Sequence, residues 1–465
     1  MKRIFKALIA GLLISGNFLT PVWADQTVEE RLADLEQQVA ILKRQIENNK
    51  EDTTTKAKDT PIITANAKDG FSIKSADDAY KLKIGGYVQA DARIFTDGKN
   101  QGNTDTFLAR RVRPIISGTV ARDFDFYLMP DLAGSGGTTP QIIDAYAEYK
   151  YFPGFKVRGG KFKVPFSIES LQPTTVTNFA ELGLPSNLYP NRDVGFQVSG
   201  DVLKDRLSYA VGVFNGSTDG QATSDTDTNN DKNIAGRIFV QPFKNTAWED
   251  LKGFGIGYAA TLGHQEGNSS TNGIGSYKSP GQVSVFSYAS ATSGAANAVT
   301  ANGPLVRTSP QVYFYRNSLG LLGEYVSSRQ ELTRNNGAIK DKFNNTAWQL
   351  SGSYVLTGEL ASYKGVTPRT DFDPSKGTWG AFELVGRYGE LKIDSSVFDE
   401  GFANLNTAIS KEQAWAAGFN WYLNKNTKLM FDFEQTKFTR GVADNLSGGN
   451  RKPENVVTSR LQLSF

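Results

Sequence analysis

The sequence predicts an all-β fold, a sixteen-stranded antiparallel transmembrane β-barrel preceded by a short N-terminal coiled-coil helix. Three features lead to this prediction. Apolar and polar residues alternate in runs of about ten residues, long and short links take turns between these runs, and the sequence closes on an aromatic residue, Phe465. The barrel is predicted over residues 81–465.

The alternation is clear in an early run and in a late one. Leu82 and Ile84 share one face of an extended chain, whereas Lys83 and Gln89 share the other. The run from Ala414 to Leu423 alternates in the same way. About ten residues allow a tilted strand to cross a bilayer. Soluble β-sandwiches show the same alternation, so the lengths of the links are needed to distinguish a sandwich from a membrane barrel.

The links favour a membrane barrel. The sixteen candidate strands begin near residues 81, 107, 123, 140, 155, 192, 206, 232, 251, 306, 318, 344, 377, 410, 426 and 454. Long links are expected at 96–106, 133–139, 167–191, 215–231, 263–305, 332–343, 392–409 and 441–453. Short links fall between them, although those near 244–250 and 359–376 are longer than the pattern requires. An even strand count with short turns on one rim and long loops on the other is typical of outer-membrane barrels.

The end of the sequence supports the same location. Leu461, Leu463 and Phe465 lie on one face of the last predicted strand. A final strand ending in an outward-facing Phe is typical of barrels assembled into the outer membrane. We therefore expect the protein in the outer membrane of a Gram-negative bacterium, in contact with membrane lipid and lipopolysaccharide.

The amino terminus has the pattern of a secretory signal. Met1–Ala24 combines a basic start, an apolar run and a small-residue site, so cleavage is predicted after Ala24. The apolar run is too short to span a bilayer comfortably, and no later stretch approaches ~18 continuous apolar residues.

A coiled-coil segment is predicted next, over residues 25–50. Its apolar residues are spaced alternately by four and three positions, and they are Val28, Leu32, Leu35, Val39, Leu42 and Ile46. The alternative is an amphipathic helix packed on its own barrel. The mixture of Val, Ile and Leu does not fix the number of helices in the coil. Residues 51–80 are predicted to be a flexible linker because the stretch from Glu47 to Lys58 is polar and charged.

Charge and composition exclude several classes of function. The formal net charge is +3, but Met1–Ala24 holds three bases and no acid, so the rest of the chain has 48 basic and 48 acidic residues. A neutral chain does not predict nucleic-acid binding. With no cysteine and a single histidine, His264, the sequence has little for a metal site or a His-based catalytic triad. We therefore expect no cofactor, no metal and no enzyme.

Six stretches in the same order resemble the phosphate-selective porin O and P family. They are Phe107–Arg113, Arg158–Phe166, Arg192–Phe196, Leu321–Val326, Tyr354–Glu359 and Asn420–Asn424. The resemblance extends from about residue 82 to 465. It implies a sixteen-stranded trimeric barrel whose lumen is lined by arginines and lysines that pass anions, phosphate in the best-known members.

The family's lining arginines match this sequence at one stretch. Alternation points Arg111 and Arg113 into the lumen and Arg110 outward, where its side chain would reach the lipid headgroups. Arginines in a narrow, low-dielectric channel attract counter-ions, and a guanidinium binds phosphate oxygens in pairs.

The same face rule selects further lining cations. Lys161 and Lys163 are predicted to point inward and Phe162 outward. Arg237 and Arg307 are also predicted to point inward. Each of these side chains is a candidate for the anion path.

Two other arginines complete the candidate set. Arg192 closes the link 167–191, which in the resembled family folds into the channel. Arg387 shares its face with Glu383, which offers it an ion-pair partner. The alternative role for all of these cations is to brace the wall, because the same rule also points acids inward. Those acids are Asp91, Asp125, Asp131, Asp144 and Glu148.

The leading hypothesis is therefore a passive diffusion channel for anions, with phosphate or polyphosphate as its solute and a homotrimer as its assembly. One alternative is a general porin without phosphate preference. Another is a barrel that mainly tethers the envelope through its periplasmic coil. An outer-membrane enzyme ranks third, because it would have to act without the usual histidine chemistry.

Overall fold

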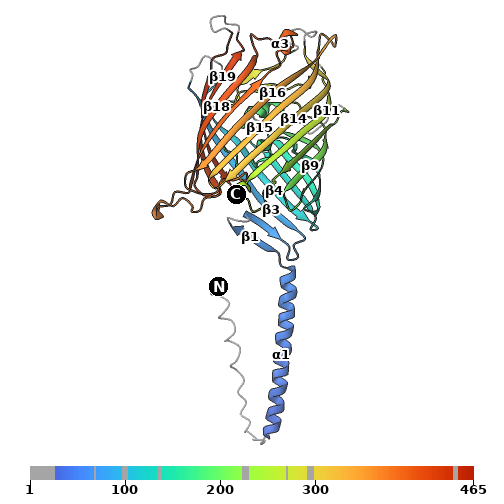
Figure 1. The fold of residues 1–465 in the computed structure, drawn as a ribbon. Helices are drawn as coiled ribbons and strands as arrows, with labels where there is room; N and C mark the ends of the chain where they lie inside the picture. The colour runs from blue at the N-terminus through green and yellow to red at the C-terminus, as the bar shows by residue number, and fades with distance from the viewer. Residues whose placement is uncertain are drawn as a thin grey trace. The chain divides into compact units, whose positions relative to one another are not determined.

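The computed structural model describes residues 27–465, except 67–69, 97–102, 135–138, 222–229, 269–270, 291–297 and 443–448. The predicted signal at 1–24 lies outside the described residues. The chain forms two compact units, residues 1–60 and 61–465 (Figure 1).

In the first unit, a single helix, α1 (Val28–Asp59), follows a capping box. The backbone N–H of Thr27 donates to the Glu30 carboxylate at 3.1 Å, and the Glu30 N–H donates to the Thr27 hydroxyl at 3.4 Å. Leu32, Leu35 and Leu42 of the heptad seam are each more than half exposed. A coiled coil stays a prediction, and the exposed seam is the surface that it would bury. None of the described helices is long and apolar enough to cross a bilayer.

The second unit is a closed antiparallel barrel of 16 strands within the described chain, as the sequence predicts. Its strands are β3 (Lys81–Phe95), β4 (Thr106–Val120), β5 (Phe124–Asp131), β6 (Gln141–Phe152), β7 (Phe155–Lys163), β8 (Arg192–Val202), β9 (Leu207–Phe214), β10 (Asn233–Val240), β11 (Phe254–Glu266), β14 (Thr300–Arg316), β15 (Leu319–Arg334), β16 (Ile339–Val355), β17 (Ala381–Lys392), β18 (Ile409–Tyr422), β19 (Thr427–Arg440) and β20 (Glu454–Ser464). Shorter elements lie in the links: α2 (Ile168–Leu171), η3 (Leu184–Leu188), η4 (Glu249–Leu251), the pair β12 (Tyr277–Lys278) and β13 (Ser284–Phe286), η7 (Pro374–Lys376) and α3 (Ser396–Asp399).

Strand β20 closes the barrel by pairing with β3, from Val456 opposite Phe95 to Ser464 opposite Tyr87. Phe465 then exchanges two backbone hydrogen bonds of 3.0 Å with Gly86. A Cβ at Gly86 would lie 2.6 Å from the Arg113 carbonyl oxygen, so only glycine fits at this junction.

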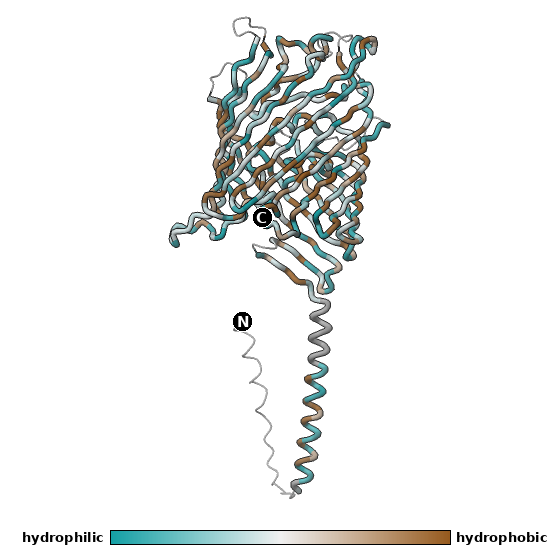
Figure 2. The backbone as a smooth tube through the Cα atoms, viewed as in Figure 1, coloured by the Kyte–Doolittle hydropathy of each residue, from teal (hydrophilic) through white to brown (hydrophobic). Residues whose placement is uncertain are grey.

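The wall has an apolar outer face and a polar inner face. On β3, Val88 and Ile94 are exposed, whereas Gln89, Asp91 and Arg93 are buried inside. Hydrophobic residues recur along the barrel strands in Figure 2. A polar lumen inside an apolar band is the arrangement that lets a barrel sit in lipid.

The two rims differ in their links. The C-terminus lies at the short-turn rim, with links 121–123, 153–154, 203–206, 317–318 and 423–426 and the longer links 241–253 and 356–380. Most long loops lie at the other rim. One predicted long link, 332–343, is instead a tight turn of four residues between Arg334 and Ile339. Asn335, Asn336 and Gly337 there adopt positive φ, which lets both strands continue almost to the tip.

The predicted linker 51–80 also differs from the structure. Helix α1 continues to Asp59, and the strands β1 (Ile62–Asn66) and β2 (Gly70–Lys74) follow. Strand β2 pairs with β3 over Lys81–Ile84, the part of the β3 edge that lies beyond its pairing with β20. Ile63, Phe71 and Ile73 continue the outer face of β3, which explains why this stretch is extended.

Candidate anion pathway through the barrel

The link between β7 and β8, residues 164–191, folds into the lumen, and we call it the inner loop. Phe166 and Ile168 in it are fully buried. It is anchored to the wall along β14–β20: the Ser167 hydroxyl donates to Glu324 at 2.8 Å, and Asp432 accepts from the Ala180 N–H at 2.8 Å. The infolding that the family resemblance implied is therefore present, and it narrows the lumen.

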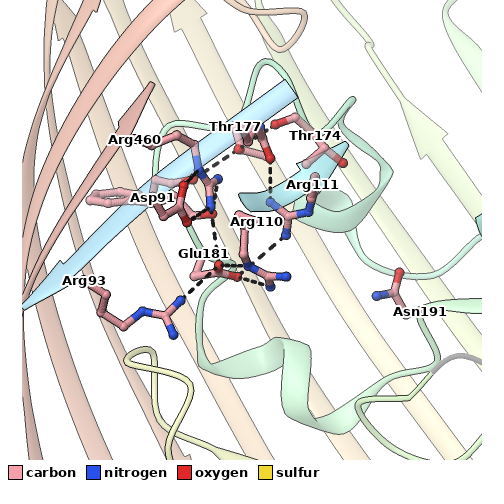
Figure 3. Close-up of polar contacts among 12 residues, drawn as sticks. Asp91, Arg93, Arg110, Arg111, Thr174, Thr177, Glu181, Asn191 and Arg460 are labelled. Atoms are coloured by element: carbon pink, nitrogen blue, oxygen red, sulfur yellow. Dashed lines mark hydrogen bonds and ion pairs between the residues drawn. The ribbon is translucent and has the colours of Figure 1, made fainter. Parts of the chain in front are cut away.

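Four arginines surround the carboxylate of Glu181 at the tip of the inner loop (Figure 3). Arg110 forms two hydrogen bonds with it, Nε to Oε1 at 2.6 Å and Nη2 to Oε2 at 3.1 Å. Nη2 of Arg460 lies 3.4 Å from the carboxylate, Nη2 of Arg93 3.6 Å and Nη2 of Arg111 3.8 Å. The group brings together strands β3, β4 and β20 with the inner loop.

Arg110 faces the lumen, so its predicted outward direction is wrong. The register between β3 and β4 shifts at this point: Gln89 pairs with Arg111, but Ala90 pairs with Ala109. Arg110 is the extra residue of a β-bulge. A bulge resets the alternation of faces, and it lets the adjacent residues Arg110 and Arg111 both point inward.

The cluster carries an excess of positive charge. Arg460 binds Asp91 at 2.6 and 2.7 Å, and Arg113 binds Asp131 at 2.9 Å. In the described part of the chain, five arginines (Arg93, Arg110, Arg111, Arg113 and Arg460) thus face three carboxylates, a surplus of two positive charges. Burial raises the pKa of Glu181, but the neighbouring guanidinium groups, Arg110 foremost, outweigh it and hold this pKa well below its usual range. Glu181 is therefore charged, and the surplus stands.

A cavity of about 660 Å³ lies inside the barrel along β3–β10. It reaches from Thr174 of the inner loop to Phe465 at the short-turn rim. Five cationic side chains line it, Lys83, Arg158, Lys163, Arg192 and Arg237, with a single acidic side chain, that of Asp144, among its described lining residues. Its walls therefore favour anions too.

The structure places four of the predicted cations in this pathway beside Arg113. Arg111 donates to Gln89 at 2.8 Å. Lys163 donates to the carbonyl oxygens of two inner-loop residues at 2.5 and 2.6 Å. Arg192 binds Asp144 at 2.9 Å, and Nε of Arg237 donates to a glutamine at 2.9 Å.

Two other predicted cations brace the wall. Arg307 has no exposed surface and is bound by Asp219 at 2.6 Å and by the Ser217 carbonyl at 2.9 Å. Arg387 binds Glu434 at 2.8 Å and, at longer range, a glutamate of the inner loop. Its predicted partner Glu383 instead accepts a hydrogen bond from a tyrosine.

The predicted directions in β7 need correction. Phe162 points inward, where it packs between the rings of Tyr146 and Phe214 at centroid distances of 5.9 and 5.5 Å. The register places Lys161 beside Ala145 and Val194, on the opposite face of β7 from Phe162. Lys161 is not among the described residues that line the cavity, so its part in the anion path stays a prediction. The inner loop covers an apolar core inside the barrel, so an apolar residue need not face lipid.

Sequence reasoning missed Arg93, Arg158, Arg460 and Glu181. The face rule could have found two of them, because Arg93 alternates with apolar neighbours on β3 and Arg460 precedes the apolar face of β20. Glu181 lies in a loop, where no periodic signal exists.

A closed barrel with an apolar outer face, a polar lumen and an infolded loop defines an outer-membrane channel. The chain belongs to the phosphate-selective porin O and P family, whose model matches residues 82–465. It is 25% identical over 437 residues to Porin O of Pseudomonas aeruginosa, covering 87% of this chain and 92% of that protein.

Solved structures share the fold. The outer membrane channel DcaP of Acinetobacter baumannii has a TM-score of 0.54 and 14% identity, covering 84% of this chain and 99% of that one. The trimer form of OmpT from Vibrio cholerae has a TM-score of 0.50 and 10% identity, covering 83% and 100%. The protein is thus an outer-membrane porin of a Gram-negative bacterium, and its family and fold are those of a channel rather than an enzyme.

Proposed function

We propose that this porin passes small anions by passive diffusion, phosphate among them, and that the arginines around Glu181 set its preference. One observation carries the proposal: five arginines face three carboxylates where the inner loop narrows the lumen. Fixed positive charge in a narrow, low-dielectric passage concentrates anions and repels cations.

The spacing of cations supports conduction rather than tight binding. The cluster at Glu181 is followed by the cations of the cavity, so an anion meets several sites in series. Conduction requires sites strong enough to attract the ion but weak enough to release it. Partial pairing serves this balance, because Glu181 lies 3.8 Å from Arg111 and tempers its charge while Arg111 also donates to the neutral Gln89.

A general porin without phosphate preference is the second candidate. The ion pairs in the cluster favour this candidate. The guanidinium of Arg110 forms two hydrogen bonds with the Glu181 carboxylate, and that of Arg460 forms two with Asp91. A guanidinium held in this way has fewer donors for phosphate.

A homotrimer forms part of the proposal. The exposed seam of α1 offers a surface for association between copies. The same seam is compatible with the tether alternative, in which the helix binds another envelope component.

The zero-current potential across a planar bilayer in a KCl gradient tests the function. We expect the sign of this potential to show that chloride is more permeant than potassium. We also expect added phosphate to reduce the chloride current. Arg111→Ala should lower the chloride preference, whereas Arg316→Ala, at an exposed rim pair with Asp250, should not. Equal passage of both ions through the unmodified channel would contradict the proposal. Anion preference without block by phosphate would favour the general porin.

A further inference from the structure

The cavity between the inner loop and the short-turn rim is lined by aromatic rings as well as by cations. The rings are those of Tyr87, Tyr127, Tyr146, Phe162, Tyr209 and Phe465, and other apolar side chains lie between them. At about 660 Å³, the cavity falls in the size range of small-molecule sites, which are mostly apolar with a few placed polar groups.

The rings are held in fixed positions. Tyr127 and Tyr146 stack nearly parallel, with centroids 5.3 Å apart and planes 11° apart. The guanidinium of Arg158 lies over the Tyr146 ring at 4.2 Å and over Phe162 at 5.3 Å. Glu148 holds this guanidinium at 2.8 Å. The aromatic rings and the planar guanidinium are therefore preorganised, so these side chains need not rearrange to bind a ligand.

Two cations beside the rings have neutral partners rather than acids. Lys163 is held by carbonyl oxygens and Arg237 by Gln311, and neither has a carboxylate within ion-pair distance among the described residues. The cavity thus joins aromatic surface to two basic side chains, Lys163 and Arg237, whose described hydrogen-bond partners are neutral.

The rings of this wall offer little to inorganic phosphate, which the cations alone would attract. The face of an aromatic ring carries negative partial charge, so it repels a bare anion and offers it no hydrogen bond. An anion that carries its own ring gains from the same surface, because rings attract one another when they are offset or edge-on. The tyrosines therefore favour anions whose charged group is attached to an aromatic ring over anions without one.

We propose that this cavity is a binding site for anions built on a single aromatic ring, with the ring against Tyr127 and Tyr146 and the charged group drawn by Lys163 and Arg237. The inference rests on the proposed function, since it treats the cavity as part of the anion path. It adds a substrate class, the small aromatic anion, to the small inorganic ions.

Block of chloride current in planar bilayers tests the site, with phenyl phosphate and glycerol 2-phosphate as probes. Both are phosphate monoesters and dianions above about pH 7, so they differ in the ring and not in the charge. Phenyl phosphate should halve the current at a concentration roughly threefold to tenfold lower, the effect of one or two ring contacts. Equal potency of the two probes, or no block by either, would overturn the inference.

Variants assign the effect to the rings. Tyr127→Leu and, separately, Tyr146→Leu should bring phenyl phosphate to the potency of glycerol 2-phosphate and leave the latter unchanged. Tyr354→Leu, at an exposed ring on the outer face, is the matched control and should keep the difference. Chloride conductance in the same recordings shows that each variant is folded.

The two proposals fail in different ways. A channel that prefers potassium contradicts the proposed function itself. A channel that prefers chloride but does not distinguish the probes, or whose preference survives both tyrosine substitutions, overturns only the aromatic site.

Discussion

Arg110 and Glu181, 71 positions apart in the chain, are joined by two hydrogen bonds, at 2.6 and 3.1 Å, between a guanidinium and a carboxylate that are both buried. The pair fastens the inner loop to β4 across the lumen. It exists because a β-bulge turns Arg110 inward, and the bulge leaves Arg111 beside it with only a distant contact to the same carboxylate. One arginine thus holds the loop while its neighbour lines the passage.

Glu181→Gln should increase anion preference. It removes the negative charge that four arginines share, so the fixed positive charge beside the inner loop grows. We expect the chloride-to-potassium permeability ratio, from zero-current potentials, to rise roughly twofold to tenfold. Glu249→Gln, on an exposed side chain in a short-rim link, is the control and should not change it. A lower ratio in Glu181→Gln would show that the carboxylate positions the arginines more than it neutralises them.

Two lysines of β7 provide a matched pair. Lys163 lines the cavity, whereas Lys161 is not among the described residues that line it. Lys163→Met should lower the chloride-to-potassium permeability ratio, whereas Lys161→Met should leave it close to that of the unmodified channel. The same bilayer recordings measure both. Equal effects would mean that the lysines act through the overall charge of the barrel.

We predict that Arg387 contributes more to the stability of the fold than to the ion preference of the channel. It binds Glu434 on the wall and Glu169 on the inner loop, and all three side chains are buried. Arg387→Ala leaves both acids unpaired, which costs about 3–5 kcal/mol. Unfolding in denaturant, followed by the loss of the compact band on unheated gels, measures this cost.

An exposed ion pair gives the comparison for Arg387. Arg316 and Asp250 form a pair on the short-turn rim, and such pairs contribute about 0–1 kcal/mol. Arg316→Ala should therefore hardly shift the denaturant midpoint. The triple change Arg387→Met with Glu434→Gln and Glu169→Gln should recover part of the lost stability, because it removes the charges of both acids together with that of Arg387. A loss in Arg387→Ala no larger than in Arg316→Ala would contradict the bracing role.

Deleting residues 26–48 tests the role of the helix. Because α1 belongs to a unit separate from the barrel, single-channel conductance and ion preference should be unchanged. If the exposed seam binds copies to each other, crosslinked trimers should become fewer. If it tethers the envelope, attachment is lost while the trimer persists. Reduced conductance would show that the helix takes part in the channel.

Alternation and link lengths were sufficient to predict the sixteen strands, because each strand crosses the same apolar layer. The same rule also pointed Arg111 and Arg113 inward. The rule failed where a β-bulge interrupted the alternation and where the lumen held an apolar core. At Arg110, the one extra residue of the bulge changed the face of the residues that precede it in β4. At Phe162, the inner loop supplied an apolar core inside the barrel.

Other features of the site depend on contacts between distant residues. Glu181 meets its arginines only because the inner loop crosses the lumen, and nothing local in residues 164–191 specifies that crossing. The roles of Arg307 and Arg387 likewise followed from their partners: Asp219 lies in a loop and Glu434 on a strand two places away from Arg387. The sequence identifies inward cations but does not separate those that line the path from those that brace it.

The pairing of β20 with β3 also constrains how the barrel is made. Asp91 and Arg460, which lie on these two strands, are 369 positions apart, so their contact forms only after nearly all the intervening strands are in place. Until then, two long strand edges stay open, and lipid cannot satisfy their hydrogen bonds. Seam formation should therefore be the last and slowest step of folding, and an unsealed barrel should be the species most exposed to proteolysis.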